Sequence, residues 1–215
     1  MNTKKILINS FKAGLDAVRP ENIIKNKLPS PPKGRTYVIG AGKAAASMAK
    51  AIELNWPRNL PLNGNVITRY KHSLKTKKIK IYESGHPMPD TAGMKAANNF
   101  INNMQKLNNN DLLLCLISGG GSSLMAVPQD GLNMKDLRNV TKDLLNCGAE
   151  ISEINTVRKH LSKTHGGKVP IYTKAKIVSL IISDVTGDRI TDIASGPCYP
   201  DPTTFKNAIN ILEKY

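Results

Sequence analysis

Two runs of the chain are apolar at nearly every position, and they constrain its fold more than any other feature. "LLLCLI" spans residues 112–117, and "KIVSLIISD" spans residues 176–184. A strand with apolar side chains on both faces must be covered on both faces, which is typical of a parallel sheet flanked by helices. These runs therefore predict two fully buried strands.

The rest of the chain alternates between strand-like and helix-like segments. Short β-branched or aromatic runs predict strands at 35–40, 65–70 and 79–84. Helix-forming composition and apolar spacing predict helices at 4–18, 43–54, 91–107, 133–148, 152–167 and 203–215, with Asp90 capping the third. This alternation predicts an α/β fold with a mainly parallel sheet, and 215 residues suffice for one large domain.

The composition limits the possible partners and compartments. The formal charge of +15 includes a basic cluster at Lys71–Lys80, for which a solvated surface is the favoured interpretation, a small anionic substrate the next and nucleic acid the third. No apolar run approaches the roughly 20 residues of a membrane span, and the N-terminus lacks a signal peptide. Three widely spaced cysteines predict a cytoplasmic location and no metal site of their own.

Ligands bind at the carboxyl ends of strands in such sheets, and the first strand ends in "GAGK". Gly40, Gly42 and Ala45 match G-x-G-x-x-A, which lets the backbone approach a pyrophosphate. A tight turn between strand and helix explains the two glycines equally well. Lys43, expected in the first helical turn, is interpreted as facing an anion because a cation there opposes the helix dipole. Arg69 stands where a dinucleotide site would place an acidic residue, which suits a phosphate better than a ribose.

A glycine-rich loop follows the apolar run at 112–117. It is neither a Walker A loop nor a nucleophile elbow, since neither motif occurs in the chain. Bare backbone N–H groups beside hydroxyls would form a phosphate cradle. The predicted nucleotide-binding residues of this loop are Ser118, Gly119, Gly120, Gly121, Ser122 and Ser123.

Two later segments carry further polar candidates. In the helix predicted at 152–167, Asn155, Arg158 and Lys159 are candidates for binding a carboxylate or phosphate, whereas His160 and His165 are weak acid/base candidates. After the second apolar run, Asp184 and Asp188 could hold Mg²⁺, or one could accept a hydroxyl proton. The structural alternatives are a turn at Asp188 and a helix N-cap at Asp201, ahead of the last helix.

Six segments taken together resemble one family. In chain order they are "VIGAGKAAASMAKAIE", "ESGHPMPDTAG", "LISGGGSSLMAVP", "GAEISEINTVRKHLSKTHGGK", "SLIISDVTGD" and "ASGPCYPDPTTF". The chain resembles the N-terminal domain of the class II glycerate 2-kinases, also called the MOFRL family. The resemblance implies a Rossmann-like sheet with helices on both faces, ATP and Mg²⁺ as cofactors, and D-glycerate phosphorylated to 2-phosphoglycerate or, less often, 3-phosphoglycerate.

The resemblance also implies residue roles. Lys43 and Asp184 take the catalytic positions, and the cleft is lined by the loop from Gly119 to Ser123 together with Asn155, Arg158 and Lys159. The family has a second, smaller C-terminal domain that supplies an arginine, and residues 1–215 end before it. We therefore expect a truncated N-terminal domain that holds half of the site, with a homo-oligomer or a separately encoded C-terminal domain as partner.

Two other functions stay open at this point. The G-x-G-x-x-A turn and Arg69 would also suit an NADPH-dependent hydroxypyruvate reductase. A non-catalytic remnant that binds only nucleotides or other anions is the third interpretation. Of the three, the glycerate kinase is the preferred prediction, with a small-molecule substrate and neither nucleic acid nor membrane as partner.

Overall fold

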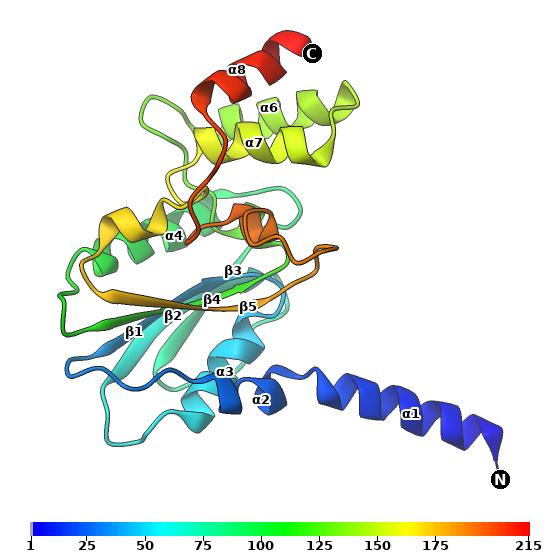
Figure 1. Cartoon of the computed structure of the whole chain (residues 1–215), viewed down its shortest axis with the longest axis vertical. Helices are drawn as coiled ribbons and strands as arrows, with labels where there is room; N and C mark the ends of the chain where they lie inside the picture. The colour runs from blue at the N-terminus through cyan, green and yellow to red at the C-terminus, as the bar shows by residue number, and fades with distance from the viewer. Residues whose placement is uncertain (1) are drawn as a thin grey trace.

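A computed structural model describes residues 2–215, and its centre is a five-stranded sheet. The strands are β1 (Thr36–Ala41), β2 (Leu62–Arg69), β3 (Ile79–Ser84), β4 (Leu112–Ser118) and β5 (Lys176–Ile182). All neighbours pair in parallel, in the order β3-β2-β1-β4-β5. This is the doubly wound order of Rossmann-like sheets, so the predicted fold class is confirmed (Figure 1).

Helices cover both faces of the sheet. On one face, α3 (Ala45–Asn55) packs its Met48 and Ile52 against Val38 of β1 and Leu114 of β4. On the other face, α4 (Thr91–Met104) packs Phe100 against residues of opposite parity in the same strands. β4 is buried at all seven positions, as expected for a strand between two apolar layers.

The second apolar run is not fully buried, and this prediction was wrong. β5 lies at the edge of the sheet and pairs with β4 alone. Its residues from Ile177 to Ile182 are half-buried, although their apolar side chains pack toward both cores. An apolar run thus indicates that both faces are packed, but it does not say whether the strand has neighbours on both sides.

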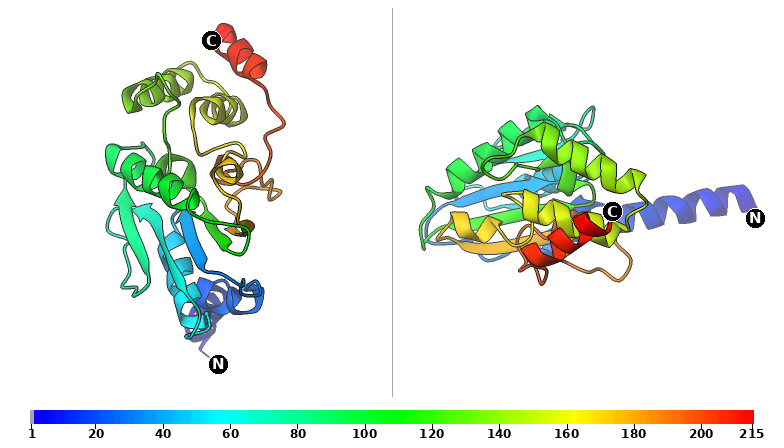
Figure 2. Two further views of the ribbon diagram at one scale, coloured as in Figure 1. Left: turned by 90° about the vertical axis from the view of Figure 1, so that its left-hand side faces the viewer. Right: turned by 90° about the horizontal axis from the view of Figure 1, so that it is seen from above.

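A second layer of helices stands over the sheet (Figures 1 and 2). It contains α6 (Met134–Asn146), α7 (Ile151–Leu161) and α8 (Phe205–Lys214), which share a small core around Leu144, Val157 and Ala208. The prediction that α7 would continue to residue 167 was wrong. The chain becomes extended at Ser162, where a β-bridge to Pro128 replaces the next helical turn.

The caps explain where these helices begin. Asp90 caps α4 by accepting from the Gly93 amide, as predicted. The predicted N-cap at Asp201 was wrong, because Thr204 caps α8 in a capping box with Asn207. Five short helices were not predicted: α2 (Pro20–Ile23), α5 (Gly121–Leu124) and the 3₁₀ turns η1 (Lys25–Lys27), η2 (Val169–Tyr172) and η3 (Ile193–Ser195).

Helix α1 (Thr3–Ala17) projects away from the rest of the molecule (Figures 1 and 2). All its side chains are exposed or nearly so, including Leu7 and Phe11. Across residues 2–215, no helix combines the length and the apolar character that crossing a membrane requires.

Candidate active site

The candidate site lies where β1 and β4 meet, because the strand order reverses at this point. The turns that follow the two strands are bonded to each other. The Lys43 amide donates to the Gly119 carbonyl at 2.8 Å, and the Ala44 amide donates to Ser118 Oγ at 3.0 Å. These bonds hold the "GAGK" turn against the glycine loop, so the two segments form one unit.

An ion pair lies across this unit. Lys43 Nζ lies 3.1 Å from Asp184 Oδ2, although 141 positions separate the residues in the chain. Both side chains are about half exposed, at 45% and 48%, so a ligand can reach them. Lys43 was expected in the first turn of α3, but the helix begins two residues later at Ala45, which leaves the lysine in the turn at the strand end.

The glycine loop approaches this ion pair more closely than any side chain would permit. A Cβ built on Gly119 would lie 1.8 Å from Asp184 Oδ2, and one on Gly120 would lie 2.7 Å from the His86 ring. Gly120 also has a φ of +85°, which few residues other than glycine adopt. The Gly120 amide N–H donates to no protein acceptor within the described part of the chain, whereas the Gly119 amide lies opposite the Ile182 carbonyl at the end of the β4–β5 ladder. The Gly120 amide is therefore free to bind a phosphate oxygen.

His86 is a site residue that the sequence reasoning missed. Burial lowers the pKa of its imidazole, and so do the positive charges of Lys43, Arg69 and Arg158, whereas Asp184 acts in the opposite sense. These four charged residues therefore lie around His86. The signal that could have identified it was the position of "GHPMPD" directly after β3, at the same edge of the sheet as the other turns.

Asp90 fixes the loop that carries His86. Its carboxylate accepts from the hydroxyls of Tyr70 and Ser84, at 2.6 and 2.9 Å, and from the amides of Gly85 and Gly93. Burial raises the pKa of Asp90, but these hydrogen bonds outweigh burial and lower it overall. The loop was interpreted as a helix cap only, and the structure shows that it also places a histidine at the site.

Several predicted nucleotide-binding groups are already bonded within the protein. Cβ atoms on Gly40 and Gly42 would meet the backbone of β4, at Leu116 and Ser118, so close strand packing explains both glycines. A Cβ on Gly121 would meet Ala194. Ser122 Oγ bonds to Ser195 Oγ at 2.8 Å, and Ser123 Oγ donates to the Gly120 carbonyl. A phosphate-binding role for these residues and for Ser118 stays a prediction.

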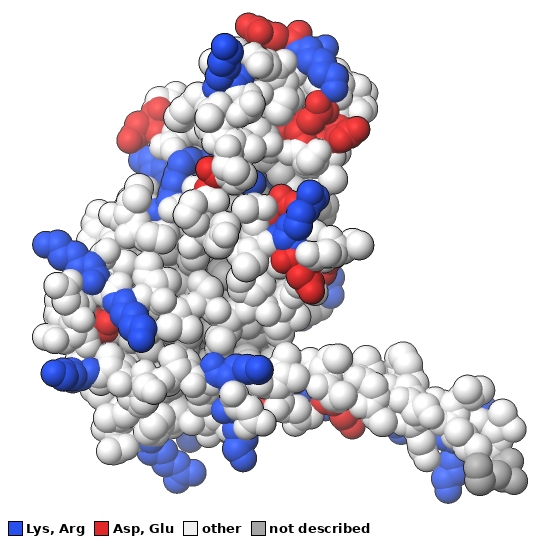
Figure 3. Space-filling view, in the orientation of Figure 1, with Lys and Arg blue, Asp and Glu red and all other residues white. Residues whose placement is uncertain are grey.

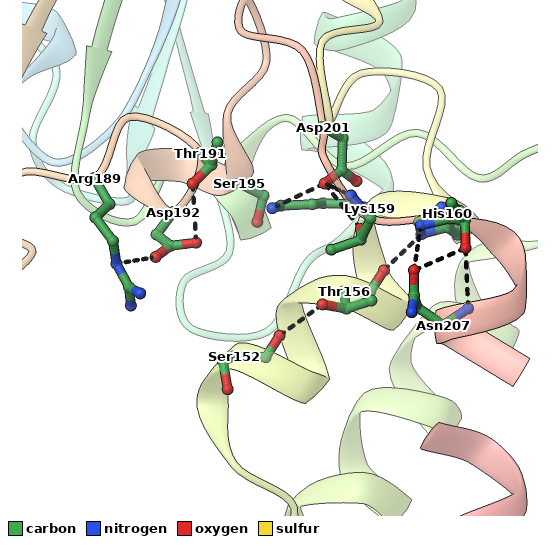
Figure 4. Close-up of polar contacts among 12 residues, drawn as sticks. Ser152, Thr156, Lys159, His160, Arg189, Thr191, Asp192, Ser195, Asp201 and Asn207 are labelled. Atoms are coloured by element: carbon green, nitrogen blue, oxygen red, sulfur yellow. Dashed lines mark hydrogen bonds and ion pairs between the residues drawn. The ribbon is translucent and has the colours of Figure 1, made fainter. Parts of the chain in front are cut away.

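Helix α7 brings Arg158 near His86, but it uses Lys159 elsewhere, and no contact of the Asn155 side chain with the site is found among residues 2–215. The Lys159 ammonium lies 3.4 Å from Asp201 in a buried ion pair, which ties α7 to the segment before α8 (Figure 4). His160 is also structural, since its Nδ1 bonds to the Thr156 carbonyl at 2.9 Å. No hydrogen bond or ion pair of the Arg158 side chain is found among residues 2–215, and burial lowers its pKa.

Arg158 shares a small pocket with Ser122 and His165. His165 is 1% exposed, and neither ring nitrogen has a partner in the part of the chain described. Burial, together with the charges of Arg158, Lys168 and Lys159, lowers the pKa of His165 to about 3. The imidazole is therefore neutral at physiological pH and cannot act there as the acid that its position in the sequence allowed.

This neutral histidine makes stability depend on pH. The unfolded chain binds a proton below the ordinary pKa of 6.5, while folded His165 binds none until about pH 3, so stability is lost as the pH falls below 6.5. We expect His165 to lower the free energy of unfolding by about 1.4 kcal/mol between pH 7.5 and pH 5.5. Urea unfolding at both pH values should show this difference in the wild type and lose it in His165→Gln. The matched variant of the exposed His72, His72→Gln, should retain it, and equal pH dependence in all three proteins would contradict the assignment.

Asp184 and Asp188 are the carboxylates that could hold a metal ion at this site. Within residues 2–215, no group of three or more His, Cys, Asp or Glu side chains could hold a metal ion. Asp188 is exposed in a turn with a φ of +50°, and its amide donates to the Val185 carbonyl. Mg²⁺ usually takes one or two carboxylates together with phosphate oxygens and waters, and Asp184 beside the free Gly120 amide, which could hold a phosphate, fits that kind of site.

Comparison with known proteins places the chain among longer relatives. Residues 6–215 match a family described as a domain of unknown function, DUF4147. A D-glycerate 2-kinase of Thermotoga maritima is 42% identical over 214 residues, which cover 99% of this chain and 51% of that protein. A protein of Agrobacterium vitis, provisionally named hydroxypyruvate reductase, is 44% identical over 216 residues, which cover 100% of this chain and 49% of that protein.

A solved structure shares the fold. The crystal structure of a glycerate kinase from Thermotoga maritima matches 99% of this chain with a TM-score of 0.91 and 42% sequence identity. The match covers 51% of that chain. The chain thus spans about half the length of the curated relatives it matches.

Proposed function

The chain belongs to the DUF4147 family, and we propose that it forms the ATP-binding half of a kinase that phosphorylates D-glycerate to 2-phosphoglycerate. The observation that supports this most is the Lys43–Asp184 pair beside the glycine loop and the free amide of Gly120. Phosphoryl transfer depends on positioning and on charge stabilisation, and this arrangement offers a donor, a cation and a carboxylate at one exposed edge of the sheet. We also propose that a second domain, in the half of the relatives that this chain does not match, supplies the rest of the active site.

In this proposal, one set of residues binds the γ-phosphate and another acts on the substrate hydroxyl. The amide of Gly120 and the Lys43 ammonium bind the γ-phosphate oxygens, and the absence of a side chain at Gly119 lets the phosphate approach Asp184. Asp184 accepts the proton from the 2-hydroxyl of glycerate as that oxygen bonds to the γ-phosphorus, while the bond from phosphorus to the bridging oxygen breaks and ADP leaves. Asp184 would also hold Mg²⁺, which would supply charge neutralisation. Its binding by Asp188 stays a prediction.

Arg158 and Asn155 are proposed to bind the substrate carboxylate. Arg158 is a half-buried guanidinium with no carboxylate partner among the described residues, and guanidinium groups bind carboxylates with two parallel hydrogen bonds. Lys159 is a weaker candidate, since Asp201 occupies its ammonium. A homo-oligomer and a cytoplasmic location also stay predictions.

The reductase is the second candidate, because Arg69 lies near His86 and would suit the 2′-phosphate of NADPH. Against it, the amides of Gly42, Lys43 and Ala44 already donate to Ile67, Gly119 and Ser118. A thermal-shift comparison separates the two candidates. We expect ATP with Mg²⁺ to raise the melting temperature and NADPH to leave it unchanged, and the reverse result would favour the reductase.

Turnover is best tested in a chimaera. This chain replaces the matched half of the Thermotoga maritima D-glycerate 2-kinase, with which it shares 42% identity. We expect the chimaera to form 2-phosphoglycerate from glycerate and ATP. A chimaera that is folded and binds ATP but forms no product would support a non-catalytic remnant instead.

A further inference from the structure

A cavity lined by basic side chains lies far from the candidate active site. It occupies about 610 Å³ between the end of α3 and the segment that leads into β3. Five cationic side chains line it: Lys50, Arg58, Lys75, Lys77 and Lys78. Because α3 runs back along the sheet, this cavity lies at the opposite end of the helix from Lys43, and eleven helical residues separate the two by about 16 Å.

The cavity presents hydrogen-bond donors almost exclusively. None of its five cationic side chains forms an ion pair with a carboxylate of residues 2–215. Trp56 also lines the cavity and is 4% exposed, and its indole N–H has no acceptor in the described chain. A buried donor without an acceptor is rare in folded proteins and calls for an explanation.

The potential acceptors of the cavity are already used. The Glu53 carboxylate accepts from the amides of Lys77, Lys78 and Ile79, at 2.7, 2.5 and 2.5 Å. The Thr76 hydroxyl donates to the Ile79 carbonyl at 2.6 Å. These bonds fix the backbone that carries Lys77 and Lys78, so these two lysines stay beside the cavity.

The surrounding chain has the same charge bias. Residues 43–82 contain nine Lys and Arg and a single acidic residue, Glu53. Figure 3 shows most of the visible acidic side chains in the upper part of the molecule, above the sheet. A concentration of like charge around a concave surface attracts multivalent anions.

We propose that this cavity binds a small molecule that carries two or more phosphate groups. Phosphate oxygens supply the acceptors that the five cations lack. The volume falls within the usual range for small-molecule sites, about 300–1,000 Å³. Single-stranded nucleic acid fits less well, because it requires exposed aromatic faces for base stacking and Trp56 is almost fully covered.

The test uses the only tryptophan of the chain, which lies in this cavity. Sodium tripolyphosphate is titrated into the protein without Mg²⁺ while tryptophan emission is recorded. We expect a saturable change, and a dissociation constant that rises at least tenfold in Lys75→Gln/Lys77→Gln/Lys78→Gln. The matched control Lys4→Gln/Lys5→Gln/Lys12→Gln removes the same charge from the exposed helix α1 and should change it less than twofold.

Three outcomes would overturn the proposal. Equal weakening by both triple variants would show diffuse attraction to a basic protein. Loss of the response in Lys43→Ala, with the cavity variant unaffected, would assign the anion to the glycine loop. Displacement of tripolyphosphate by a twentyfold lower concentration of single-stranded oligonucleotide would assign the surface to nucleic acid. Circular dichroism of each variant confirms that it is folded.

Discussion

Asp184→Asn is expected to lower the kcat of glycerate phosphorylation about 100- to 10,000-fold in the chimaera described above, which is the usual contribution of a proton acceptor in the transition state. Asparagine keeps the size of the side chain and can still accept from Lys43 Nζ, 3.1 Å away in the wild type. It cannot take a proton from the substrate hydroxyl. ATP binding should change much less than turnover, because the Gly120 amide and the Lys43 ammonium remain.

The control for this variant is a carboxylate that lies on the surface. Asp143 is exposed on α6 and its side chain makes no hydrogen bond or ion pair, so Asp143→Asn should retain kcat within twofold. Steady-state kinetics at saturating ATP, combined with calorimetric ATP titration, separate chemistry from binding. Near-normal kcat in Asp184→Asn would refute the proton-accepting role and leave Asp184 as a partner of Lys43 only.

The sequence predicted where the site would form because of one property of parallel sheets. The carboxyl ends of their strands share an edge, so unusual residues directly after β1, β4 and β5 had to lie close together. Lys43, Gly119 and Asp184 do so, although each comes from a different part of the chain. The prediction needed only the strand ends and not the side-chain conformations.

Features that depend on long-range packing could not be predicted in this way. The neighbours of β5 are set by the strand order, which an apolar pattern does not reveal. The ion pair of Lys159 with Asp201 spans 42 residues and takes both residues away from the roles that local spacing suggested. His86 reaches the site because Asp90 folds its loop through four hydrogen bonds.

Gly40 and Gly42, in the turn after β1, also show what the sequence pattern could not decide. The G-x-G-x-x-A pattern left ligand contact and tight packing equally possible. The structure shows tight packing at Gly40 and Gly42, because a side chain at either position would meet the backbone of β4. Their absence of side chains is therefore needed to bring the two strand ends together, and the ligand contacts are supplied by groups beside them.

Gly42→Ala is accordingly expected to lower the free energy of unfolding by about 3 kcal/mol or more. Gly42 has a φ of +144°, which is costly for any residue with a side chain. The new Cβ would also lie 2.0 Å from Ser118 Oγ and 2.5 Å from the Ser118 carbonyl oxygen, and the latter belongs to the backbone of β4 and cannot rotate away. Relief would require β1 and β4 to separate at their carboxyl ends, which would break the bonds of Lys43 and Ala44 to the glycine loop.

The matched comparison is Gly14→Ala. Gly14 lies in α1, where a Cβ would meet nothing within 4 Å and the helix projects from the rest of the molecule. Urea unfolding of this variant should therefore stay within about 0.5 kcal/mol of the wild type, as is usual for surface substitutions. A small effect of Gly42→Ala, similar to that of Gly14→Ala, would mean that the turn can open without cost. In that case Gly42 would be required for ligand contact rather than for packing, and ATP binding by the folded variant should then be lost.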